Sequence, residues 1–291
     1  MIDALSIFLR ALGFIAMFQA AGMAIYVSLF KNELSTALTR AHRRNGYMAA
    51  MAALALVAAH FCMEPARMGG GFGSIADPFM RELALDSPLA KALAWRMSGL
   101  LFLVLGFAVS TRMERSMALL GAALVLVSFT QIGHTSVLSP RPLLGGLLLL
   151  HIAIAAFWFG ALLPLRAAVR SEPAEDAARI VERFSRIAIW LVPVLFAAGL
   201  SMAALMLGTR ELPTSPYGRL LILKVMLFGV EMALASLNRW RYSPALAAGN
   251  HAAVKSFGRT AIAEYVLITI IFAVTATLTT LYSPIPADAG Y

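Results

Sequence analysis

The sequence predicts an all-α, polytopic membrane protein built as a bundle of eight transmembrane helices. Of its 291 residues, 60% are hydrophobic and only 13% are charged, whereas about a quarter of the residues in a soluble domain are charged. The apolar residues fall into segments of roughly twenty, the length that a helix needs to cross a bilayer. The short alternating strands of a membrane β-barrel are missing from the sequence. We therefore expect one transmembrane helical domain over residues 1–291.

The predicted spans follow one another along the whole chain, separated by polar, Gly-rich or Pro-rich stretches. They are Ala4–Phe30, Gly46–Glu64, Ala92–Thr111, Ser116–Val137, Leu143–Val169, Ile187–Gly208, Gly218–Asn238 and Phe257–Tyr282. Two short helices are expected between spans. One lies near Phe79–Leu85 in the longest loop, and the other begins after Ser171-Glu172-Pro173, where Pro follows Ser as at many helix starts.

Lys and Arg residues predict the orientation of the bundle, because they gather on the cytoplasmic side of membrane proteins. The segments Lys31–Arg44, Arg112–Arg115, Arg166–Arg186 and Arg239–Arg259 lie on one side and carry roughly twice as many Lys and Arg residues as the other side. We expect this side to be cytoplasmic. Both termini then face outward, which agrees with an even number of spans.

The net charge of +9 therefore reflects topology, and no nucleic-acid partner is expected. One cysteine cannot form an intramolecular disulfide. No G-x-x-x-x-G-K-[ST] stretch is present, so an ATP-driven pump is not expected.

Three histidines are the most informative residues of the spans. His60, His134 and His151 all fall in the outer third of the membrane, whereas His42 and His251 fall in cytoplasmic loops and are expected to be solvated. Ionisable groups in hydrocarbon are costly and usually mark a pathway or a binding site. A tight turn separates His134 from His151, so their helices are antiparallel neighbours and the two side chains are expected at similar depths. The structural alternative is that they hydrogen-bond neighbouring helices.

The residues that follow His60 add further metal-binding groups. Met63 and Glu64 lie three and four positions after His60 and would share its helix face. Cys62 would point away unless the helix end turns it inward. Imidazole, thioether, carboxylate and thiol together are the ligands of a transition metal, above all copper, as Cu(I) or Cu(II). The sequence thus predicts a metal site at His60, His134 and His151, with Met63, Glu64 and Cys62 as further ligands.

Charged residues also occur deeper in the last two spans. Lys224 and Glu231 lie seven positions apart on one face of the seventh span, and Glu264 lies in the eighth. Buried charges must pair or coordinate something. They are candidates for an ion or proton relay below the outer site, and the alternative is an interhelical ion pair with Lys224 reaching outward.

Several stretches of the chain resemble the copper resistance protein D (CopD) family of bacterial inner-membrane proteins. They are Gly133-His134-Thr135, His151 with Phe157-Trp158-Phe159-Gly160, Ser215-Pro216-Tyr217-Gly218-Arg219-Leu220-Leu221 with Lys224, and Leu237-Asn238-Arg239. The resemblance implies eight helices, a place in the inner (cytoplasmic) membrane with periplasmic termini, and copper uptake. It also implies a periplasmic partner, a copper chaperone resembling copper resistance protein C.

The leading hypothesis is a copper carrier that is not an enzyme. It accepts copper from the periplasm at the histidines and moves it inward across the lipid bilayer. The alternative is a b-type haem protein, such as a membrane cupric reductase, in which the same histidines are axial haem ligands. A third hypothesis is a copper sensor or assembly partner, which a bundle without a polar route below His151 would favour.

Overall fold

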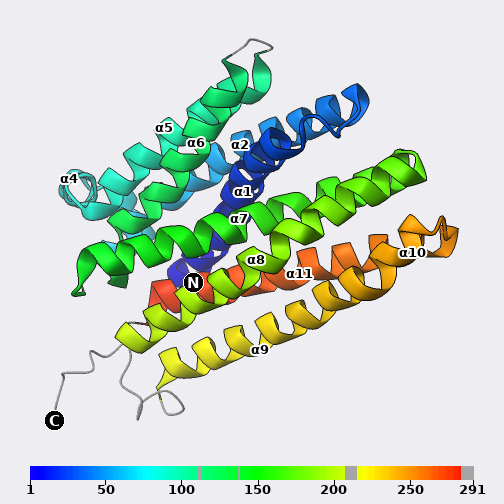
Figure 1. The fold of residues 1–291 in the computed structure, drawn as a ribbon. Coiled ribbons are helices and arrows are strands. Elements are labelled where there is room, and N and C mark those ends of the chain that lie inside the picture. Colours follow the sequence, from blue (N-terminus) through cyan, green and yellow to red (C-terminus); the bar gives the residue numbers. More distant parts are fainter. Residues whose placement is uncertain (110–112, 137, 207–214, 283–291) are drawn as a thin grey trace.

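The computed structural model describes residues 1–109, 113–136, 138–206 and 215–282, and these are almost entirely helical, with no strand among them (Figure 1). Thr111, Val137 and Gly208, where three of the predicted spans end, lie outside these residues. The long helices are α1 (Ile2–Phe30), α2 (Thr36–Cys62), α5 (Pro88–Ala108), α6 (Glu114–Val127), α7 (Arg141–Ser171), α8 (Ala174–Met206), α9 (Pro216–Leu237) and α11 (His251–Leu281).

Short elements join the long helices. They are α3 (Glu64–Gly69), η1 (Phe72–Ile75), α4 (Pro78–Leu85), the 3₁₀ turns η2 (Ser128–Gln131) and η3 (His134–Ser136), the π-helical turn η4 (Asn238–Tyr242) and α10 (Ser243–Ala247). Helix α4 confirms the short helix expected in the longest loop. The second short helix, expected after Ser171-Glu172-Pro173, is the beginning of α8 and runs without a break into the sixth span.

Within the described residues, seven helical segments are long and apolar enough to cross a membrane. They comprise α1, α2 with α3, α5, α7, α8, α9 continued through α10, and α11. The fourth predicted span, Ser116–Val137, was wrong as one continuous helix, because α6 ends at Val127. There the hydroxyls of Ser128 and Thr130 donate to the carbonyl oxygens of Val125 (2.5 Å) and Val127 (2.8 Å). Such bonds compete with helical ones, and the chain continues in 3₁₀ turns.

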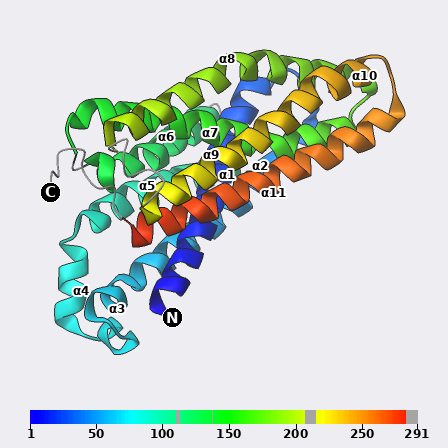
Figure 2. The ribbon, with the colours of Figure 1, turned by 90° about the horizontal axis from the view of Figure 1, so that it is seen from below.

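The turn η2 extends α6 far enough for an eighth crossing. Fourteen α-helical residues rise about 21 Å and four 3₁₀ residues add about 8 Å, which is close to the ~30 Å of the hydrocarbon core. Arg10 near the start of α1 also donates to the carbonyl oxygen of Thr279 near the end of α11 (3.3 Å). Both ends of the described chain therefore lie at the same end of the bundle, as an even number of crossings requires (Figure 2).

Helix α1 is the centre of the molecule and packs against α2, α6, α7 and α11. Two glycines allow its closest approach to α7. A Cβ atom at Gly22 would lie 1.8 Å from the carbonyl oxygen of Ala156, and one at Gly160 would lie 2.4 Å from the carbonyl carbon of Gly22. Small residues of this kind let helix backbones meet in membranes, so this contact fixes α7, which carries His151, against the core.

Helices α5 and α6 form an antiparallel hairpin against α2. Gly99 and Gly121 face each other, since a Cβ at Gly99 would lie 2.8 Å from the carbonyl oxygen of Gly121. At the inner end of the hairpin, Arg43 of α2 donates to the carbonyl oxygen of Phe107 (3.0 Å) and pairs with Glu114 (2.5 Å). The arginine thereby satisfies a carbonyl that the end of α5 leaves without a helical partner.

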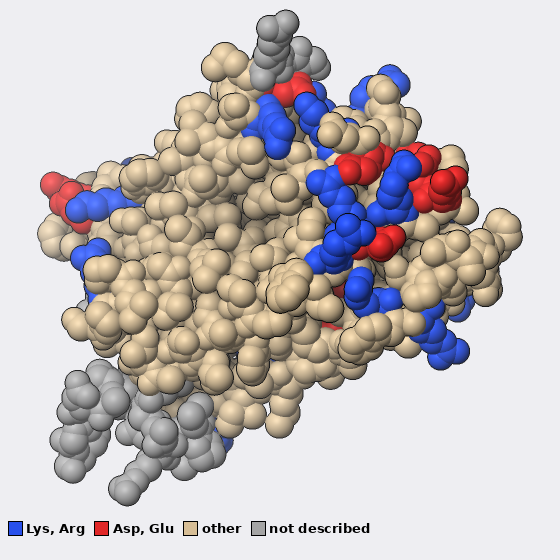
Figure 3. Space-filling view, viewed as in Figure 1, with Lys and Arg blue, Asp and Glu red and all other residues tan. Residues whose placement is uncertain are grey.

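The surface has the character of a membrane protein. Lys and Arg gather, with Asp and Glu among them, at the end where the α7–α8 turn and α10 lie, and an almost uncharged band covers the middle (Figure 3). Large apolar side chains of α8 and α9, such as Trp190, Leu200 and Val225, are exposed. The chain is a multi-pass membrane protein, and the lipid bilayer covers these side chains.

Candidate functional site

His151 lies in α7, ten residues after the start of that helix at Arg141. Its Nδ1 atom lies 2.9 Å from the carbonyl oxygen of Leu195 in α8. A carbonyl oxygen only accepts hydrogen bonds, so Nδ1 carries the hydrogen and Nε2 keeps its lone pair. This is the usual way in which a protein fixes a metal-binding imidazole. The Nε2 lone pair of His151 therefore points away from the bond to Leu195, as the predicted role as a metal ligand requires.

The partner expected for His151 is His134, at the start of η3. The turn η3 packs against α7, in line with the expected neighbourhood. The side chain of His134 lies outside the described part of the structure. The meeting of the two imidazoles stays a prediction.

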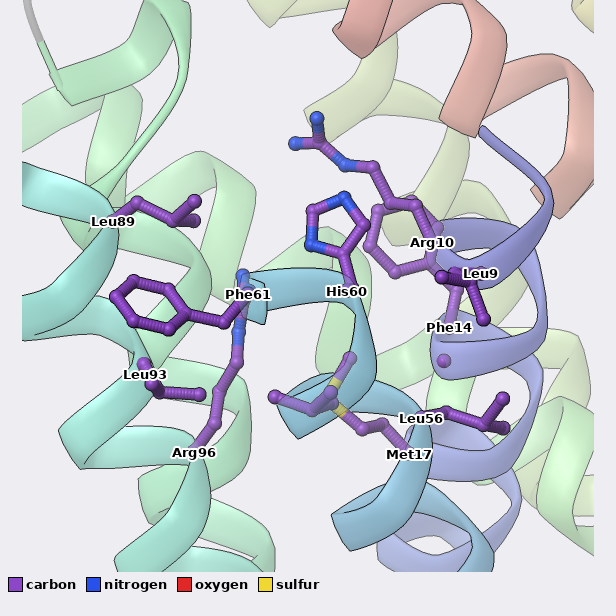
Figure 4. A pocket seen from close by; sticks show the side chains of 12 residues that line it. Leu9, Arg10, Phe14, Met17, Leu56, His60, Phe61, Leu89, Leu93 and Arg96 are labelled. Atoms are coloured by element: carbon purple, nitrogen blue, oxygen red, sulfur yellow. The ribbon is translucent and has the colours of Figure 1, made fainter. Parts of the chain in front are cut away.

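His60 is buried near the end of α2, and its Nε2 atom lies 3.2 Å from the hydroxyl oxygen of Ser6 in α1. Figure 4 shows the ring between the side chains of Arg10 and Arg96. Two guanidinium groups disfavour a metal cation beside this imidazole. His60 thus has surroundings unlike those of His151.

Helix α2 ends at Cys62, and the three side chains expected as ligands after His60 have different surroundings. Cys62 is exposed, and Met63 is buried between α2 and α3. Glu64 is held by Arg67, at 3.2 Å. Among the described side chains, no three of His, Cys, Asp and Glu come together as a metal site.

A buried carboxyl pair lies deeper in the bundle. Glu231 of α9 and Glu264 of α11 are 2% and 3% exposed, and their carboxyl groups are close enough to interact. Glu264 accepts hydrogen bonds from the indole Nε1 of Trp158 (3.4 Å) and from the amide of Asn238. The oxygens of Glu231 make no hydrogen bond of normal geometry among the described residues.

The carboxyl pair meets the criteria for a functional site in a membrane. Acidic side chains within spans are rare and usually face a pathway for ions or protons. Asn238 also begins the π-helical turn η4, and such turns are frequent at functional sites. Trp158 lies seven residues after His151 in α7, which places the pair about 10 Å further into the membrane along that helix.

Lys224 does not pair with Glu231, although seven positions separate them on one helix. No ion pair joins Lys224 to an acidic group in the described part of the chain. Its charge acts on His151 instead. Lys224 thus lies close enough to His151 for its charge to reach the imidazole.

His42 corrects an expectation, since it was expected to be solvated but is only 1% exposed. The α2 helix begins at Thr36, earlier than predicted, because Ser35 caps it by accepting from the backbone N–H of Leu38 (3.2 Å). The ring of His42 packs edge-on against Tyr26, with 5.9 Å between centroids. His251 is exposed, as expected.

Comparison with protein families identifies the chain. A family model described as "Copper resistance protein D" matches residues 178–278, and one described as "Copper resistance protein D-like, N-terminal domain" matches residues 1–139. The chain belongs to the copper resistance protein D family. No curated protein and no solved structure matches it.

Membership in the copper resistance protein D family indicates a role in copper resistance or transport, and a transporter-like protein rather than an enzyme. Copper and the lipid bilayer are its partners. Lys224, Glu231 and Glu264 all fall within the segment matched by the first model, whereas His151 falls between the two segments. The family match gives the haem alternative no support.

Proposed function

We propose that this protein takes up copper from the periplasm and carries it inward across the bacterial inner membrane. The observation that supports this most directly is the buried carboxyl pair below His151. Two turns further along α7, Trp158 meets Glu264, which interacts with Glu231. A sensor or assembly partner has no need of buried carboxyl groups beneath its metal site, whereas a transported cation does.

Copper binds first, in this proposal, at the outer end of the bundle. The exposed thiol of Cys62 would receive Cu(I) from a chaperone resembling copper resistance protein C, and the buried thioether of Met63, the next residue, would take the ion further in. Glu64 is engaged by Arg67. It therefore contributes less than the two sulfur ligands.

His151 and His134 form the next site. The hydrogen bond from His151 to Leu195 orients one imidazole, and η3, which begins at His134, packs against the same helix α7. A site with few ligands suits a transporter, because the ion must bind well enough to enter and weakly enough to leave. Lys224 repels a bound cation and favours its release.

Glu231 and Glu264 provide the inner step. Two adjacent carboxylates repel each other in a medium of low dielectric, and a cation or a proton between them relieves that repulsion. We propose that copper replaces a proton on this pair as it moves inward. Uptake would then release protons.

The test is copper uptake by the purified chain in proteoliposomes, with a copper-sensitive dye inside. We expect His151→Ala and His134→Ala to abolish both copper binding and uptake, and Glu231→Gln and Glu264→Gln to reduce uptake while copper still binds outside. His251→Ala and Glu182→Gln are matched controls, because both side chains are exposed.

Each outcome decides a part of the proposal. Full uptake by the His134/His151 double variant would contradict the site. Stoichiometric copper binding without uptake by the wild-type protein would contradict transport and support a sensor or assembly partner. A strong Soret band with near-stoichiometric haem would replace the carrier with an electron-transfer protein.

A further inference from the structure

A small cavity lies between α1, α2 and α5, away from His151. Its volume is about 20 Å³, which is room for about one water-sized group. Arg10, Met17, His60 and Arg96 are among the residues that line it (Figure 4). The cavity therefore combines an apolar wall with three nitrogen-bearing side chains.

Arg96 is buried with little to balance its charge. Only 6% of the residue is exposed. Its Nε donates to the hydroxyl of Ser128 (3.1 Å), and its guanidinium lies over the ring of Phe129, 4.8 Å from the centroid. Its two Nη atoms make no hydrogen bond among the described residues. Burying an unpaired charge in hydrocarbon is costly.

Arg10 adds a second positive charge to the same cavity. Its Nη1 donates to the backbone of Thr279 (3.3 Å) and the hydroxyl of Thr280 (3.2 Å), both uncharged groups. Its charge acts on Arg96, and the two repel each other. Within the described residues, neither arginine belongs to an ion pair.

The acidic groups nearby are already engaged. Glu64 lies 3.2 Å from Arg67, and Asp3 lies 3.5 Å from the same arginine. Glu64 is the acidic side chain whose charge reaches Arg10. Together these groups leave the outer end of α1, α2 and α5 with more positive than negative charge.

His60 completes the donor set without needing a charge of its own. Its Nε2 interacts with the hydroxyl of Ser6, and a hydroxyl can donate as well as accept. When Ser6 donates to Nε2, the hydrogen is on Nδ1. The imidazole then offers one N–H beside those of the two arginines.

We propose that this cavity binds a small inorganic anion, of the size of chloride, between Arg10, Arg96 and His60. The unpaired guanidinium groups call for a negative charge, their free N–H groups and that of His60 donate to it, and the small volume suits an ion of about the size of a water molecule. The same charges exclude a metal cation. This site is independent of the copper function proposed above.

The test is the thermal stability of the full chain in detergent, with chloride exchanged for gluconate at constant sodium concentration. Gluconate is too large for the cavity, and the exchange leaves the ionic strength unchanged. We expect the melting temperature to rise with chloride and reach a plateau. Arg96→Gln and Arg10→Gln should each lose this response. Lys91→Gln, which removes an exposed charge at the start of α5, should keep it.

A direct measurement covers the case in which an arginine variant does not fold. Crystals of the wild-type protein grown with bromide should show one anomalous peak in contact with Arg10 and Arg96. The proposal is overturned if chloride and gluconate give the same melting temperatures, if the chloride response persists in both arginine variants, or if the bromide peak is absent from the cavity.

Discussion

Gly199 of α8 lies directly against the ring of His151 in α7. A Cβ atom at position 199 would lie 3.1 Å from Cε1 and 3.2 Å from Nδ1 of the imidazole. These distances are shorter than an ordinary van der Waals contact. The absence of a side chain at Gly199 therefore lets the imidazole reach the carbonyl of Leu195, one turn earlier in the same helix.

The substitution Gly199→Ala should weaken copper binding without unfolding the protein. The added methyl group pushes the ring away by a few tenths of an ångström and lengthens its hydrogen bond to Leu195. Loss of an orienting partner of this kind typically reduces metal affinity about 10–100-fold. A competition titration with a copper chelator measures the effect. Gly229→Ala in α9 is the matched control, since a Cβ there meets nothing within 4 Å, and equal affinities of the two variants would contradict the role of Gly199.

Lys224→Gln should have the opposite effect and raise the copper affinity of the site several-fold. The positive charge of Lys224 acts on His151, and its removal takes away a repulsion between two cations. The same chelator titration measures this change in copper affinity. Lys255→Gln, at an exposed lysine, is the control. If copper release limits uptake, the tighter variant should also transport more slowly in proteoliposomes. An unchanged affinity would place Lys224 outside the copper path.

Gly22→Ala should destabilise the bundle by about 1–3 kcal/mol, the usual cost of overpacking a core. Its methyl group would lie 1.8 Å from the carbonyl oxygen of Ala156, so α1 and α7 must separate. The free energy of unfolding in detergent measures the change. Gly146→Ala in α7 is the control, because it places a methyl group where nothing lies within 4 Å. It should be neutral or gain up to about 1 kcal/mol from helix propensity.

The helices could be predicted from hydropathy because lipid leaves few ways to satisfy a backbone. Seven predicted spans agree with long helices, and their ends differ where a single residue acts locally. Ser35 begins α2 well before the apolar run, and the hydroxyls of Ser128 and Thr130 shorten α6. Hydropathy averages over such effects.

The candidate site was predictable only as a set of residue types. The sequence indicates that His151 and Glu264 are buried polar groups, yet it does not say which helices meet. The hydrogen bond from Trp158 to Glu264 joins residues 106 positions apart. Arg10 and Arg96 were also missed as partners of His60, because their convergence depends on how α1, α2 and α5 pack. The sequence feature that could have drawn attention to them is an arginine within an apolar segment, because charged residues in membrane spans are costly.

Trp158→Phe should slow copper uptake while leaving outer copper binding unchanged. Phenylalanine keeps most of the packing against Phe184 but removes the indole N–H that donates to Glu264. A hydrogen bond to a charged group contributes about 1.5–3 kcal/mol, so an effect of roughly tenfold or more on the inner step is expected. Uptake into proteoliposomes and a copper titration of the same preparation separate the two steps. Trp190→Phe, at a tryptophan that is 76% exposed, controls for the change of residue. A loss of copper binding in Trp158→Phe would mean that the indole acts on His151, and unchanged uptake would remove Glu264 from the path.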